Sequence, residues 1–171
     1  MSNSINIIKK FYKFFPIILL FISVLNEFDF NNLGLKYFSF NFSYILIFYY
    51  SLKKSNSLGY SYIFIAGLFN DVVVGTPIGL SSLFFLLFCV SAAYLRNITL
   101  RPSLMKDWLF FLITLLIINS LFYTVLTLFF SNEIDYINLL INSGFTFILY
   151  YFFSYLFGLF EDFFIGHNNA R

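Results

Sequence analysis

The sequence is poor in charge, cysteine, histidine and proline. Only 11% of its 171 residues are charged, and it has one cysteine, one histidine and three prolines. The single Cys89 excludes an internal disulfide and a cysteine metal cluster, and His167 stands alone in a polar tail, which argues against a metal site. No Gly-rich phosphate loop, serine elbow or histidine–cysteine pair is present. These absences predict a protein that is not an enzyme and has no cofactor.

What the sequence has in excess is apolar residues, at 60% of the chain. Soluble domains are closer to half apolar and a quarter charged, so we expect an integral membrane protein. A membrane helix needs about 20 mostly apolar residues. The sequence therefore predicts one all-α domain over residues 1–171, with about six transmembrane helices in one bundle. The expected helices are 14–30, 37–52, 58–74, 78–95, 108–130 and 136–160.

The basic residues are distributed unevenly over the connections between these segments. Nine of the ten fall in the tails or the even-numbered loops, and only Lys36 falls in an odd-numbered loop. The positive-inside rule then places both termini in the cytoplasm. Because the basic residues follow the membrane topology, they give no indication that the protein binds nucleic acid. The first segment lacks a small-residue cleavage site after its apolar run, so we expect an uncleaved helix rather than a signal peptide.

The stretch GLFNDVVVGTPIGL, residues 67–80, places an acid between two apolar segments. An ionisable group in the membrane is costly and marks a candidate functional site, here Asp71. Three interpretations are open: Asp71 caps the turn or the start of the fourth helix, contacts a partner, or binds a proton or cation. Folding the chain at Pro77 brings Ser81 and Ser82 to the depth of Asp71, so both are candidate hydrogen-bond partners.

Other polar residues have simpler interpretations. Asn119 and Asn142 lie within apolar segments, where amides usually bond to neighbouring helices, although a polar ligand cavity is the alternative. The remaining acids, Asp107 among them, fall at segment ends and are expected to be solvated.

The 67–80 stretch, followed by an apolar helix and Arg96, resembles the MreD family of bacterial inner-membrane proteins. That family shows a glycine, an acid four positions later, and a Gly-x-Pro-x-Gly-Leu turn. The specific match covers about residues 66–96, and chain length and helix number extend the resemblance to most of the chain. The matching residues are Gly67, Asp71, Gly75, Pro77, Gly79 and Leu80.

The resemblance implies a non-enzymatic scaffold of the cell-elongation machinery in the bacterial inner membrane. Its partners would be an MreC-like protein and, through it, MreB, RodA and a class B penicillin-binding protein that make side-wall peptidoglycan. The implied fold is similar to that of the substrate-binding subunits of energy-coupling-factor transporters. The alternative function is therefore a vitamin-like small-molecule binding subunit, which needs a polar pocket near the outer face.

Overall fold

The described part of the chain is entirely helical. The computed structural model describes residues 2–25, 39–54, 57–99, 103–130 and 135–166. The all-helical prediction is confirmed for these residues. The helices are α1 (Ser2–Leu25), α2 (Phe42–Lys53), α3 (Tyr60–Val74), α4 (Leu80–Ile98), α5 (Leu104–Phe130) and α6 (Tyr136–Gly166).

Three helices, α4, α5 and the Tyr136–Glu161 part of α6, are long and apolar enough to cross a membrane. Helix α3 and the Phe14–Leu25 part of α1 are apolar but shorter. Helix α2 has only 12 residues, or about 18 Å at 1.5 Å per residue. The chain is thus a membrane protein in which three of the six helices meet the length criterion for a complete span.

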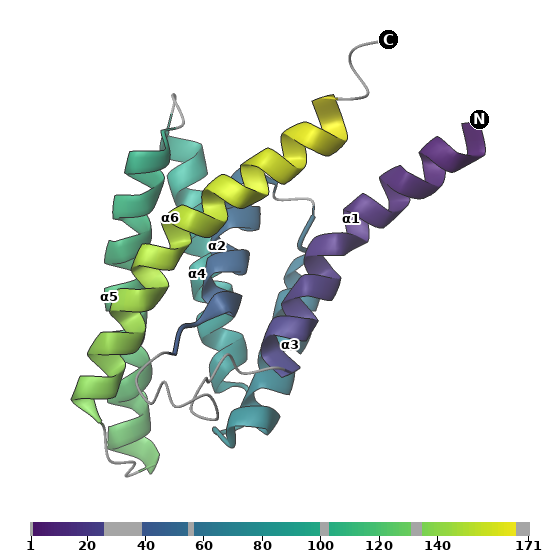
Figure 1. The fold of residues 1–171 in the computed structure, drawn as a ribbon. Helices are drawn as coiled ribbons and strands as arrows, with labels where there is room; N and C mark the ends of the chain where they lie inside the picture. Colours follow the sequence, from purple (N-terminus) through teal and green to yellow (C-terminus); the bar gives the residue numbers. More distant parts are fainter. Residues whose placement is uncertain (1, 26–38, 55–56, 100–102, 131–134, 167–171) are drawn as a thin grey trace.

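The two ends of the bundle differ in the segments they contain. The first residues of α1 and the last residues of α6 lie at the same end (Figure 1). The turn between α3 and α4 lies at the opposite end, as do the end of α5 and the start of α6. We call these the terminal end and the turn end. Under the predicted topology, the terminal end faces the cytoplasm.

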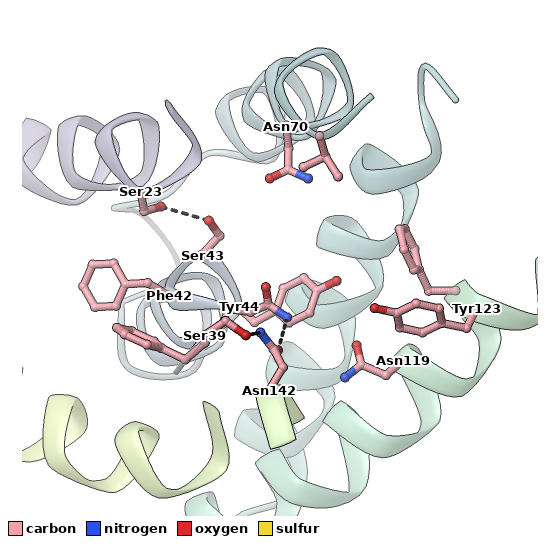
Figure 2. A pocket seen from close by; sticks show the side chains of 13 residues that line it. Ser23, Ser39, Phe42, Ser43, Tyr44, Asn70, Asn119, Tyr123 and Asn142 are labelled. Atoms are coloured by element: carbon pink, nitrogen blue, oxygen red, sulfur yellow. Dashed lines mark hydrogen bonds between the residues drawn. The ribbon is translucent and has the colours of Figure 1, made fainter. Parts of the chain in front are cut away.

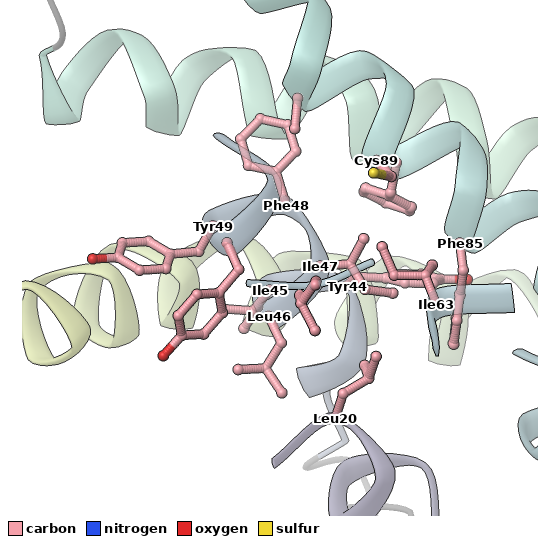
Figure 3. Close-up of a cluster of buried hydrophobic side chains, with 14 of the residues drawn as sticks. Leu20, Tyr44, Ile45, Leu46, Ile47, Phe48, Tyr49, Ile63, Phe85 and Cys89 are labelled. Carbon is pink, nitrogen blue, oxygen red and sulfur yellow. The ribbon is translucent and has the colours of Figure 1, made fainter. Parts of the chain in front are cut away.

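Helix α2 lies at the centre of the bundle, and every residue of it except Lys53 is buried. A helix that is apolar on all sides is stable only when other elements surround it. Its neighbours include Leu20 of α1, Ile63 of α3 and Phe85 of α4 (Figure 3). On the side of α5 and α6, the rings of Phe48, Phe111 and Tyr150 form one cluster, with centroids 4.2 to 5.6 Å apart.

At the terminal end, polar contacts fix α2 to three other helices. Lys53 pairs with Asp107 of α5 at 2.7 Å, and Lys54 pairs with Glu161 of α6 at 3.3 Å. Arg96 of α4 donates to the backbone carbonyl of Ser51 at 2.9 Å. The expectation that Asp107 is solvated is wrong, because its side chain is only 2% exposed. It lies in the first turn of α5, facing inward, where the lysine ammonium replaces water.

The second helix begins later than predicted. The sequence placed its start at residue 37, but residues 39–41 precede the helix and α2 begins at Phe42. The backbone amide of Asn41 donates to the Thr146 hydroxyl of α6 instead, at 2.9 Å. The predicted residues 26–30 and 37–38 lie outside the described residues. Helix α3 ends at Val74 and α5 at Phe130, which coincide with the predicted ends.

Candidate functional site

Asp71 lies in the last turn of α3, and its side chain is buried, with 1% of the residue exposed. Its carboxylate accepts three hydrogen bonds. Oδ1 accepts from the Thr76 hydroxyl at 2.8 Å and from the Ser81 backbone amide at 2.9 Å. Oδ2 accepts from the Gly79 amide at 2.7 Å. The buried carboxylate is therefore fully engaged within the chain and presents no surface to a partner.

The backbone carbonyl of Asp71 also terminates α3. The amides of Gly75 and Thr76 both donate to it, at 2.9 and 3.0 Å. Gly75 has φ +77° and ψ 24°, the left-handed conformation that ends many helices and that glycine adopts without strain. One residue thus holds the end of α3 with its backbone and the turn with its side chain.

The same carboxylate also caps the start of α4. Gly79, the residue before the helix, has φ +96° and ψ −13°, and the Leu80 amide donates to the Pro77 carbonyl at 3.1 Å. This is the type II turn geometry, which favours glycine at its third position. The first amides of a helix have no partner within the helix and attract negative charge. Asp71 supplies that charge from the preceding helix, which is the capping arrangement among the three interpretations.

The two serines proposed as partners of Asp71 have different roles. Ser81 contributes its backbone amide to Asp71, while its hydroxyl accepts from the Asn70 side chain at 3.0 Å. Ser82 does not contact Asp71 through a hydrogen bond; its hydroxyl donates to the Phe64 carbonyl at 2.9 Å. Both serines lie beside α3, as the fold of the chain at Pro77 predicts, but a sequence does not distinguish hydroxyl donors from amide donors.

Gly67 lies at a close contact between α3 and α4. A Cβ atom on Gly67 would lie 2.3 Å from the Cα and 2.6 Å from the backbone nitrogen of Ser82. Real Cβ atoms do not come within 3.0 Å of other heavy atoms, so only glycine fits. Small residues at helix contacts let backbones approach in this way. The glycine lies one helical turn before Asp71 and sets the spacing at which the cap forms.

Asn119 and Asn142 both bridge to other segments. Asn119 of α5 donates to the Ser143 hydroxyl of α6 at 2.9 Å. Asn142 accepts from the Asn41 side chain at 2.9 Å and donates to the Ser39 hydroxyl at 3.0 Å. These amides hold α5, α6 and the segment before α2 together near the turn end.

The same region contains a polar cavity of about 270 Å³ (Figure 2). Its described lining residues come from α1, α2, α3, α5, α6 and the segment before α2, and none of these described residues is charged. The sequence indicated a polar cavity for the asparagines of the last two apolar segments, Asn119 and Asn142 among them. The other members are single hydroxyls and amides near the ends of apolar segments, which meet only in the folded bundle. The polar side chains lining the cavity include Ser23, Ser43, Asn70, Asn119, Tyr123 and Asn142.

Metal chemistry has no evident site in the described ranges, because they contain no group of three histidine, cysteine or acidic residues that could hold an ion. Compared with known proteins, the chain matches no family model, no curated protein and no solved structure. The resemblance of residues 67–80 to the MreD motif therefore depends on the residues themselves.

Proposed function

We propose that this chain is a non-enzymatic membrane scaffold of the bacterial cell-elongation machinery, acting as MreD does. The observation that carries the proposal is the structural role of the residues in the 67–80 motif. Gly67 permits the close helix contact, and Asp71 caps both helices. Gly75 and Gly79 adopt the left-handed backbone conformation that the turn requires. A motif used entirely to fix the shape of one turn suits a protein that presents a surface rather than one that performs a reaction.

The surface that this turn presents is apolar and uncharged. Ile78, at the tip, is 80% exposed, and Val72, on the outer side of α3, is 70% exposed. A scaffold needs such a surface for the membrane helix of a partner. We propose that an MreC-like single-pass protein binds here and connects the chain to MreB, RodA and a class B penicillin-binding protein.

Co-purification tests this proposal. We expect the tagged protein, extracted from its native membrane in mild detergent, to recover the MreC-like partner. Ile78→Asn should reduce that recovery severalfold, because a partner helix would have to desolvate the amide. Ile137→Asn is the matched control, since Ile137 is also at the turn end and is 69% exposed. Equal loss with both variants, or no partner with the unchanged protein, contradicts the proposal.

The alternative function is a vitamin-like small-molecule binding subunit of a transporter, and the polar cavity is the observation that favours it. Recovery of transporter ATPase subunits without elongation proteins in the same experiment would select it. The cavity lies in the half of the bundle that the predicted topology assigns to the outer face, as such a subunit needs.

The predicted orientation has its own test. Both termini are expected in the cytoplasm of a bacterial inner-membrane protein, because nine of ten basic residues fall on that side. A reporter active on only one side of the membrane, fused at the carboxyl terminus or after Phe130, should give opposite results at the two positions. A carboxyl terminus outside the cytoplasm contradicts the topology.

A further inference from the structure

The polar cavity has hydrogen-bonding capacity that the described residues do not use. Asn119 and Asn70 each donate through Nδ2, to Ser143 and Ser81, and no described hydrogen bond involves their carbonyl oxygens. The hydroxyls of Tyr44 and Tyr123 point toward one another across the cavity (Figure 2), and no hydrogen bond among the described residues engages either. Two acceptors and two hydroxyls thus line one cavity.

The charge of the lining decides which groups the cavity can hold. An ionised group leaving water needs an opposite charge to offset its lost hydration, and none of the described lining residues is charged. Asp71 follows the lining residue Asn70 in the sequence but does not itself line the cavity. Its carboxylate already accepts hydrogen bonds from three donors. Amides and hydroxyls both donate and accept, so they match an uncharged group carrying hydroxyls. A volume of about 270 Å³ is near the lower limit of small-molecule sites, roughly 300–1,000 Å³.

A second hollow of about 500 Å³ lies beside this cavity, between α5 and α6. Asn119 and Tyr123 line both spaces. The threonine hydroxyls in the second hollow, those of Thr124 and Thr127, donate to carbonyls of their own helix and are not free for a ligand. Its other lining residues include three leucines, and two of these, Leu116 and Leu128, are more than half exposed on the outside of the bundle. In a membrane, this groove opens toward the lipid chains.

From this juxtaposition we infer that the bundle binds one lipid with an uncharged, hydroxyl-bearing head group. The head occupies the cavity, and an acyl chain lies in the groove between α5 and α6. The size of the cavity fits a single sugar or a glycerol ester rather than a longer saccharide. This inference does not depend on the scaffold proposal, because a scaffold and a transporter subunit could each hold such a lipid.

Native mass spectrometry of the purified full chain tests the inference. The probes are monoglucosyl-dioleoylglycerol, phosphatidylglycerol with the same acyl chains, and free glucose. We expect a one-to-one adduct with the neutral glycolipid and only background retention of the anionic lipid. Equal retention of both lipids contradicts the assignment of an uncharged head. Binding of free glucose as tightly as of the glycolipid contradicts the role of the groove.

Two variants locate the site without disturbing the fold. Tyr123→Phe removes only a hydroxyl that has no described partner, and it should weaken glycolipid binding roughly three- to tenfold, the effect of one hydrogen bond. Tyr155→Phe is the control, because Tyr155 is exposed on α6 and lines neither space. Thr124→Trp, which fills the groove, should abolish the adduct while leaving the melting temperature unchanged. Unaltered glycolipid binding in Tyr123→Phe and Thr124→Trp overturns the inference.

Discussion

Replacing Asp71 with leucine is expected to cause a large loss of stability. The leucine side chain accepts no hydrogen bond, so the Thr76 hydroxyl and the Gly79 and Ser81 amides lose their acceptor. The Ser81 bond is buried and the other two are part-buried. A buried donor left without a partner costs about 1–3 kcal/mol, and a part-buried donor costs less because water can reach it. Together the three losses should lower the melting temperature of the detergent-purified protein by several degrees and reduce the folded yield.

The Asp71→Asn variant separates charge from shape. From sequence alone, asparagine should be tolerated, since the amide keeps an acceptor and adds a donor. The geometry makes it intermediate instead. Its one oxygen can replace Oδ1, but its NH₂ group then faces the Gly79 amide, 2.7 Å away in the native protein, donor against donor. We expect stability in the order Asp, Asn, Leu. An Asp71→Leu variant as stable as the unchanged protein would disprove the capping role.

Replacing Gly67 with alanine is the second large effect that we expect. The added Cβ would lie 2.3 Å from the Ser82 Cα atom and 2.6 Å from its nitrogen, and backbone atoms cannot rotate away. Helices α3 and α4 must therefore move apart. Overpacking of this kind typically costs about 1–3 kcal/mol. The separation also stretches the bond from the Ser82 hydroxyl to the Phe64 carbonyl and shifts α4 relative to Asp71.

Gly144→Ala is the matched control for this substitution. Gly144 is also inside a helix, but a Cβ there meets nothing within 4 Å. Alanine is favoured over glycine in a helix interior by roughly 0.5–1 kcal/mol, so this variant should be neutral or slightly stabilised. Thermal unfolding followed by size-exclusion chromatography compares the two variants. Equal melting temperatures for both would show that the α3–α4 contact tolerates a methyl group.

Sequence reasoning located the α3–α4 turn because its signals are local. Gly75, Pro77 and Gly79 each restrict the backbone within a few residues, and an acid beside them in an apolar segment requires donors nearby. The identity of those donors was not predictable, because two of the three are backbone amides, which every residue except proline carries. Composition and hydropathy likewise indicated an all-helical membrane protein, since both depend on the chain as a whole.

What sequence reasoning missed depends on contacts between distant segments. Asp107 has the same local pattern as a solvated charge at a helix start, and only the packing of α2 against α5 brings Lys53 to within 2.7 Å of it. The cavity was not predictable for the same reason, because Tyr44 and Tyr123, which both line it, belong to apolar segments far apart in the chain. The length of α2 was overestimated because apolar residues continue before Phe42, where the chain bonds to α6 instead.

The short, enclosed α2 imposes an order on how the protein is made. At about 18 Å long, it is too short to cross a hydrocarbon layer of about 30 Å by itself. Its surroundings include α4 and α6, which leave the ribosome after it. The newly made α2 therefore has no stable place in the bilayer until the second half of the chain has been inserted. The first half of the molecule can therefore acquire its final structure only after α4 and α6 have been made.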